Sequence, residues 1–133
     1  MSENKGFSWQ RRIYYADTDA EGVVYHARYL EFCEQARAEL LWHLGYNSEK
    51  LKHEYGIAFA VRKAQIDYLA PAHLDDTVTI GVIPTTMTRT RFDMHQEIRN
   101  DDKLLCVIDF VMVCINLERF APQALPEGLR KKI

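Results

Sequence analysis

A strand-like segment is joined to a long helical segment by the run Tyr14-Tyr15-Ala16-Asp17-Thr18-Asp19-Ala20-Glu21-Gly22-Val23-Val24-Tyr25-His26. Its polar turn carries two carboxylates, Asp17 and Asp19, and aims an acid side chain at the N-terminus of the helix. Unpaired N–H groups and the helix dipole favour negative charge there. A carboxylate beside such an oxyanion site is the minimum equipment for hydrolysing an activated acyl group. The run therefore predicts an enzyme.

The residues after this run predict one amphipathic helix from about residue 25 to residue 44. The segment has no Gly or Pro, and apolar residues recur at spacings of three and four. Gly45 is expected to end the helix in the left-handed conformation. A helix of about 20 residues spans roughly 30 Å, so it needs a sheet to cover it. The apolar residues are Tyr29, Phe32, Cys33, Ala36, Leu40, Leu41 and Leu44.

The rest of the chain predicts strands. A first strand is expected at 7–15 and four more at 57–70, 76–86, 89–99 and 104–117, with a short polar helix or turn at 48–55. Asn100-Asp101-Asp102 is typical of a hairpin turn. The order predicts an α+β domain spanning 1–133, whose five-stranded antiparallel sheet curls around one helix.

The last predicted strand, 104–117, differs from the others because it is apolar on both faces. Strand 89–99 instead alternates apolar and charged residues, so one of its faces is expected to meet water. A strand that is apolar on both faces is expected to be central and covered on both sides. One helix covers only one face, so we expect a second subunit to cover the other.

Composition limits the function classes. At 133 residues and 47% hydrophobic, the chain has material for one domain with a core, and its net charge of −2 does not favour nucleic acid. The first six residues lack the apolar core of a secretory signal, and no apolar run approaches the roughly 18 residues that span a bilayer. Three cysteines without a C-x-x-C pair indicate neither a disulfide framework nor a zinc site. We expect a cytoplasmic domain without a cofactor.

Asp17 and Asp19 also have simpler interpretations. Either carboxylate can cap backbone N–H groups. The spacing Asp17-x-Asp19-x-Glu21-Gly22 matches the first half of a calcium loop, but the required bidentate Glu is replaced by Arg28. No G-x-S-x-G elbow occurs, and Cys33 lies on the apolar stripe of the helix. Hydrolysis without a metal would therefore depend on a carboxylate.

Residues 12–32 closely resemble the signature of the hotdog-fold acyl-CoA thioesterases of the 4-hydroxybenzoyl-CoA thioesterase type, and within them the Tol-Pal-associated (YbgC-type) subgroup. Further matches are Glu34-Gln35-Ala36-Arg37, Phe59-Ala60-Val61-Arg62-Lys63, Tyr68-Leu69-Ala70-Pro71-Ala72 and Leu74-Asp75-Asp76.

The resemblance implies a helix wrapped by a five-stranded sheet, in dimers or tetramers with active sites at the subunit interface. It implies that Asp19 is the catalytic carboxylate. The oxyanion donor would be the backbone N–H of Tyr25 or His26. Whether Asp19 acts as general base or as nucleophile stays open.

Other residues of the matching stretch are expected to assist Asp19, and cations elsewhere in the chain are expected to bind CoA. The His26 side chain is expected to orient substrate or water, with an exposed polar role as the alternative. Tyr15 is expected either to hydrogen-bond a carboxylate or to pack in the core, and Asp17 to hold the turn. Cations are needed for the phosphates of CoA, and the candidates are Arg62, Lys63, Arg89 and Arg91.

Two other functions remain open at this stage. One is a catalytically weak acyl-binding or scaffold protein at the inner face of the inner membrane, acting with acyl carrier protein. The other is a hotdog-fold hydratase acting on enoyl-CoA. The preferred acyl group depends on the pocket between helix and sheet, and its candidate wall residues are Phe59, Met94, Phe110 and Met112.

Overall fold

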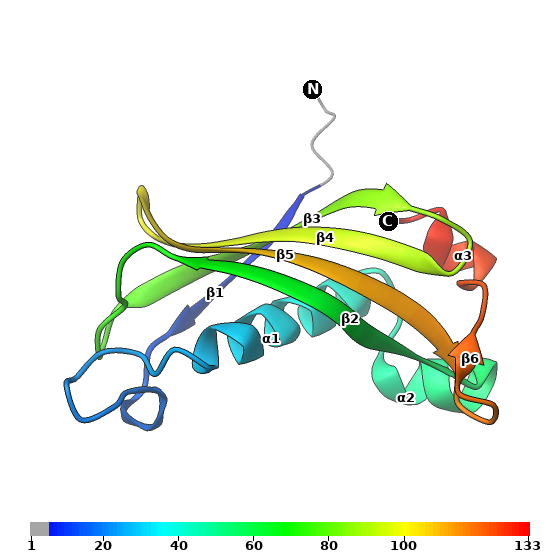
Figure 1. Ribbon diagram of the computed structural model, residues 1–133, viewed down its shortest axis with the longest axis horizontal. Coiled ribbons are helices and arrows are strands. Elements are labelled where there is room, and N and C mark those ends of the chain that lie inside the picture. The colour runs from blue at the N-terminus through cyan, green and yellow to red at the C-terminus, as the bar shows by residue number, and fades with distance from the viewer. Residues whose placement is uncertain (1–5) are drawn as a thin grey trace.

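The computed structural model describes residues 6–133 and shows a curved antiparallel sheet with one long helix along its concave face (Figure 1). Each of the five main strands is antiparallel to its neighbours. A short strand, β6 (Ala121–Pro122), pairs with the end of β5 (Lys103–Asn116). The predicted α+β class and strand count are confirmed. The prediction that the first six residues lack the apolar core of a secretory signal concerns mainly residues 1–5, which lie outside the described residues. In spatial order the strands are β1 (Phe7–Arg12), β3 (Thr77–Met87), β4 (Arg91–Asn100), β5 (Lys103–Asn116) and β2 (Ile57–Tyr68).

The long helix, α1 (Arg28–His43), begins three residues later than predicted. The backbone N–H of Tyr25 still donates to the Asp17 carbonyl at 3.0 Å, which holds the chain extended up to that point. At its other end Gly45 has a φ of 90°, as predicted. The N–H groups of Gly45 and Tyr46 donate to the carbonyls of Trp42 and Leu41, which ends the helix in a Schellman motif.

The first strand is also shorter than predicted, because it ends at Arg12. Residues Tyr15–Asp17 instead form a 3₁₀ turn, η1. The remaining helical pieces are short: α2 (Ser48–Lys50), a π-helical turn η2 (Leu51–Tyr55) and α3 (Glu127–Arg130). Strands β2 to β5 agree with the predicted bounds to within two residues, and the predicted hairpin at 100–102 is present. No helix in residues 6–133 has the length and apolar character needed to cross a bilayer.

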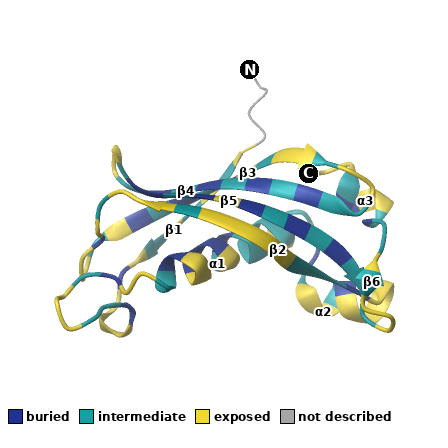
Figure 2. Ribbon diagram, in the orientation of Figure 1, coloured by how far each residue is buried: buried dark blue, intermediate teal, exposed yellow. Residues whose placement is uncertain are grey.

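The core lies between α1 and the inner face of the sheet (Figure 2). On β4 the inner residues Phe92, Met94 and Ile98 are buried while the outer charged residues are not, as predicted. On β5 only the inner face is buried. Its outer apolar residues are half-buried, so a single copy does not supply the predicted second cover; these residues are Val107, Val111, Val113 and Ile115.

Strand β2 is an edge of the sheet, and every residue from 61 to 65 is exposed (Figure 2). A register shift between Val61 and Lys63 makes Arg62 an extra residue there. The two ends of the sheet carry different elements (Figure 1). The loop end holds η1, the start of α1 and the β4–β5 hairpin. The tail end holds the end of α1, α2, the β3–β4 turn and α3.

Candidate active site

The turn between β1 and α1 is a small two-stranded ladder. Thr18 and Val24 form an antiparallel bridge, and the N–H of Asp19 donates to the Val23 carbonyl at 2.8 Å. Gly22, with a φ of 81°, closes the turn by donating to the Asp19 carbonyl at 3.0 Å. The ladder gives the carboxylates of this turn a defined place rather than leaving them on a loose loop.

The segment after β2 fixes the ladder to the body of the protein. Ala72 accepts a hydrogen bond from the N–H of Val24 at 2.9 Å, and its own N–H donates to the buried Tyr29 hydroxyl at 3.0 Å. The Tyr68 hydroxyl donates to the His26 carbonyl at 3.1 Å. Burial raises the pKa of both tyrosines, so both stay neutral near pH 7. Two separated stretches that carry the family resemblance, 12–32 and 68–72, therefore meet at the start of α1.

Asp17 is a buried structural carboxylate. Its Oδ2 accepts from the Arg11 guanidinium at 2.5 Å and from the N–H of Tyr14 at 2.9 Å. Arg11 also donates to Gln35 on α1 at 2.9 Å and lies over the Phe32 ring at 4.3 Å. This arrangement ties the turn to the helix, which supports the predicted structural role of Asp17.

Asp19 is half-buried and less engaged. Its Oδ1 accepts from the N–H of Glu21 at 2.9 Å, and its Oδ2 has no hydrogen-bond partner among residues 6–133. One oxygen therefore shapes the turn and the other is open to a ligand or water. This division fits a carboxylate that is held in place yet able to react.

The start of α1 has no side-chain cap, because Ala27 occupies the N-cap position. The N–H of Tyr25 is already used by the Asp17 carbonyl. The N–H of His26 has no acceptor within the described chain. Of the two predicted oxyanion donors, the geometry therefore leaves His26 available and Tyr25 occupied.

The side chains of His26 and Tyr15 are both exposed. The His26 ring stacks on Tyr25, with centroids 4.6 Å apart, and meets the edge of Tyr68. Tyr15 is 82% exposed, so its predicted place in the core is wrong. Its hydroxyl reaches no carboxylate among residues 6–133 of one copy, because η1 turns the ring outward.

The predicted phosphate-binding cations lie apart from Asp19. Arg62 and Lys63 are exposed on the β2 edge, and Arg89 is exposed in the β3–β4 turn at the tail end. Arg91 donates to both carboxylate oxygens of Asp93 at 3.0 Å, which raises the Arg91 pKa. Within one copy, the turn of Asp19 and the cations of the β3–β4 turn stand at opposite ends of the sheet (Figure 1).

The three cysteines are not exposed. Cys33 is buried, and burial raises its pKa to about 12, so it packs as predicted and is no thiolate nucleophile. Cys106 and Cys114 are likewise buried and free. In the described part of the chain, no group of three or more His, Cys, Asp or Glu side chains is placed to hold a metal ion.

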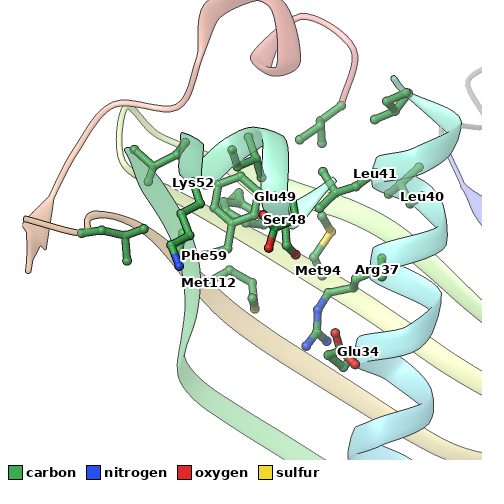
Figure 3. A pocket seen from close by; sticks show the side chains of 18 residues that line it. Glu34, Arg37, Leu40, Leu41, Ser48, Glu49, Lys52, Phe59, Met94 and Met112 are labelled. Carbon is green, nitrogen blue, oxygen red and sulfur yellow. The ribbon is translucent and has the colours of Figure 1, made fainter. Parts of the chain in front are cut away.

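A cavity of about 360 Å³ lies between the second half of α1, η2 and the inner face of the sheet (Figure 3). Three of the predicted wall residues, Phe59, Met94 and Met112, line it. Phe110 does not, because the Arg37 guanidinium covers its ring at 4.3 Å. Asp19 is not among the lining residues, so in one copy the turn and the cavity are separate.

Two groups near these features were not predicted from the sequence. Arg11 was not identified as the partner of Asp17, although β-strand alternation places it on the inner face with Phe7 and Trp9. Arg37 was named as part of the matching segment 34–37, and it hydrogen-bonds the fully buried Gln96 at 2.8 Å. The only sequence signal for Gln96 was a polar residue on the apolar face of β4.

Comparisons with known proteins identify the family and the fold. The model of the Thioesterase superfamily (4HBT) matches residues 21–107, starting just after Asp19. The acyl-CoA thioester hydrolase YbgC of Escherichia coli O6:H1 is 42% identical over 124 residues, 92% of each chain. A probable thioesterase from Bartonella henselae is 37% identical, with a TM-score of 0.86 over 91% of this chain and 99% of its own. A 1,4-dihydroxy-2-naphthoyl-CoA thioesterase from Synechocystis is 29% identical, with a TM-score of 0.89 over 96% and 95%.

Proposed function

The chain belongs to the thioesterase superfamily and has the hotdog fold, and from this premise we propose that it hydrolyses acyl-CoA thioesters to a free acid and CoA in the cytoplasm. The observation that carries the proposal is the Asp19 carboxylate, with one free oxygen, in the turn that leads to an uncapped helix start. The name of the Escherichia coli relative supports the same substrate class.

The thioester carbonyl oxygen would accept a hydrogen bond from the backbone N–H of His26. The positive end of α1 adds to this stabilisation as negative charge develops on the oxygen. Loss of one such donor in comparable sites costs about 3–4 kcal/mol. The hydrogen bond from Tyr68 to the His26 carbonyl fixes the next peptide group, between His26 and Ala27, and so supports the helix start beside the donor.

Asp19 would then act in one of two ways. As a general base it takes a proton from a water molecule whose oxygen attacks the carbonyl carbon. As a nucleophile its own oxygen attacks, and water later hydrolyses the resulting mixed anhydride. In both routes the C–S bond breaks, CoA leaves as the thiolate, and the thiolate takes up a proton.

The complete site would need a second copy of the chain. Exposed aromatic and aliphatic side chains surround the turn, which indicates that another surface covers it. They are Tyr14, Tyr15, Tyr25, Tyr68, Leu69 and Leu74.

We propose that the second copy pairs through the edge strand β2. It is twelve residues long, and an unprotected edge of that length favours pairing with another strand. Two copies paired antiparallel through β2, related by a two-fold axis, would place the loop end of each beside the tail end of the other. The turn of one copy would then face the cavity and the β3–β4 turn of its partner.

This pairing also gives a role to the separated cations. Arg62, Lys63 and Arg89 have no ion pair among residues 6–133, so they are available for the phosphates of CoA. Arg91 is held by Asp93 and would contribute only by giving up that pair. Tyr15 and the His26 ring, exposed in one copy, would contact substrate or the partner.

The test is release of free thiol from a panel of short, long and aromatic acyl-CoA esters by the purified full-length chain. We expect measurable turnover with at least one class and loss of turnover in Asp19→Asn. A variant of an exposed carboxylate on the outer face of the sheet, Asp109→Asn, serves as the matched control. Absence of thiol release across the panel would contradict the proposal, and loss of enoyl absorbance without thiol release would indicate a hydratase.

A further inference from the structure

The cavity behind α1 has a mostly apolar wall and one half-buried cation. Its size, about 360 Å³, is at the small end of the roughly 300–1,000 Å³ found for small-molecule pockets. It would therefore hold a short or medium acyl chain or a single ring. Most of its wall is apolar, and it includes Leu40, Leu41, Ile57, Phe59, Met94 and Met112.

The charge is the guanidinium of Arg37, which lines the cavity (Figure 3). Its Nη1 donates to Gln96 Oε1 at 2.8 Å, and its carbon lies 4.3 Å from the centre of the Phe110 ring. Gln96 is itself fixed, since its Nε2 donates to the Cys33 carbonyl at 3.2 Å. The guanidinium is therefore held in one position by neutral groups.

No carboxylate in residues 6–133 forms an ion pair with Arg37. Two carboxylates also line the cavity, those of Glu34 and Glu49, and both side chains are exposed (Figure 3). A cation removed from water without an anion is unfavourable. Burial accordingly lowers the pKa of Arg37, against the opposing effects of Cys33 and Glu34.

The guanidinium still has donors to offer. It has five N–H groups in a planar fork, and only one nitrogen has a hydrogen-bond acceptor here. No described side-chain nitrogen or oxygen is both sealed from solvent and unpaired, so the remaining nitrogens of Arg37 are accessible. A carboxylate matches this fork and would supply the missing negative charge.

We propose that this cavity binds an apolar chain or ring that ends in a carboxylate, with the carboxylate on Arg37. Two kinds of molecule have this chemistry. One is a free carboxylic acid, whose binding does not depend on the proposed function. The other is an acyl-CoA whose acyl group carries a second, distal carboxylate; this form rests on the proposed function.

The first arm of the test measures binding of octanoate and of octan-1-ol to the full-length chain by calorimetry. If the free acid is the ligand, octanoate binds about ten- to a hundredfold more tightly than the alcohol, as expected for a charge-assisted hydrogen bond in a site shielded from water. In Arg37→Met this preference disappears, while binding of the alcohol stays within about threefold of the wild-type value.

The second arm measures binding of octanoyl-CoA and suberoyl-CoA, which differ by the distal carboxylate, to Asp19→Asn. This variant keeps the cavity and prevents hydrolysis during the measurement, so a failure of the proposed function does not affect the result. If the distal carboxylate is the ligand, suberoyl-CoA binds at least about tenfold more tightly, and adding Arg37→Met removes the difference.

Two further variants keep the test decisive. Arg37→Lys keeps the charge and loses the fork, so it should retain part of the carboxylate preference even if Arg37→Met is poorly folded. Lys52→Met removes an exposed cation at the rim and should leave the preference intact. A preference in either arm that depends on Arg37 supports the proposal and identifies the source. No preference in both arms, or a preference that survives in Arg37→Met, overturns it.

Discussion

The buried side and the exposed side of the turn 15–26 carry the same chemical group in two different settings. On the buried side, Asp17 is bound by Arg11 and by the N–H of Tyr14. On the exposed side, Asp19 uses one oxygen to hold the turn and leaves the other free. Two residues of separation are enough for this difference, because Asp17 lies in the 3₁₀ turn η1 whereas Asp19 lies in the ladder, where its N–H donates to the Val23 carbonyl.

The comparison shows how a fold can separate stability from reactivity within one short segment. The Asp17 carboxylate has its charge compensated by a cation, so it has little to offer a substrate. The Asp19 carboxylate has no cation within ion-pair distance among residues 6–133. The carboxylate that we propose to react is thus left uncompensated beside the one that holds the structure.

The largest expected effect is on turnover in Asp19→Asn. The amide oxygen of Asn can still accept from the N–H of Glu21, so the turn and the free energy of unfolding should change little. Loss of the general base or nucleophile should lower kcat by about 10²- to 10⁴-fold. Thiol-release kinetics and denaturant unfolding on the same sample check both statements, and near wild-type kcat would remove Asp19 from the catalytic role.

The converse substitution, Asp17→Asn, should reverse the pattern. It leaves the Arg11 guanidinium without its carboxylate in a buried position, and breaking such a pair costs about 3 kcal/mol or more. We expect that loss in urea unfolding, with activity falling only through loss of folded protein. A stable Asp17→Asn with kcat as low as that of Asp19→Asn would erase the distinction between the two carboxylates.

A smaller effect is expected at the helix start. Tyr68→Phe removes the hydroxyl that donates to the His26 carbonyl, which should cost about 1 kcal/mol of stability. Because this bond fixes the peptide group that follows the proposed oxyanion donor, kcat should fall several-fold while KM changes little. An increase in KM alone would show that Tyr68 acts on substrate binding and not on the His26 peptide group.

The smallest effect is expected for His95 on the outer face of the sheet, because its ion pairs are more exposed than the pair of Asp17 with Arg11. His95 donates to Glu97 at 2.9 Å and to Asp109 at 2.7 Å, and these hydrogen bonds raise its pKa above its ordinary value near 6.5. Its stabilising contribution is therefore present below pH 6.5 and is lost as the pH rises through the raised pKa.

Unfolding of the wild type and of His95→Gln measures this contribution. The wild type should be more stable by about 1 kcal/mol or less near pH 6, and the difference should shrink near pH 9. A difference that grows with pH would contradict the sign. The same measurement gives the stabilisation from a more exposed ion pair, with which the loss of stability in Asp17→Asn can be compared.

Much of the fold could be predicted from local pattern. The apolar spacing on α1, the alternation on β4 and the Gly at the end of α1 each report an interaction within a few residues. The start of α1 was misplaced because the bond from Tyr25 to Asp17 spans the turn. That bond arises from the ladder, which has no periodic signal in the sequence.

The site was predictable only in part, for a related reason. The Asp17–Asp19 turn is contiguous, so the sequence could place its two carboxylates between the first strand and the helix start. Arg11, Gln35, Gln96 and Arg37 act through partners on other elements, and no local pattern pairs them. Tyr15 was expected in the core because aromatic residues favour burial, but the 3₁₀ turn points it outward.

The central claim is that Asp19 of one copy acts on a substrate held by the cavity of another. Its most direct test mixes two inactive variants, Asp19→Asn and Ala38→Trp, the latter filling the cavity at a half-buried position on its wall. In a symmetric dimer, one of the two sites of each mixed pair regains both parts. An equal mixture, dissociated and reassembled, should therefore recover about a quarter of wild-type thiol release. A mixture that stays as inactive as its components would contradict the claim.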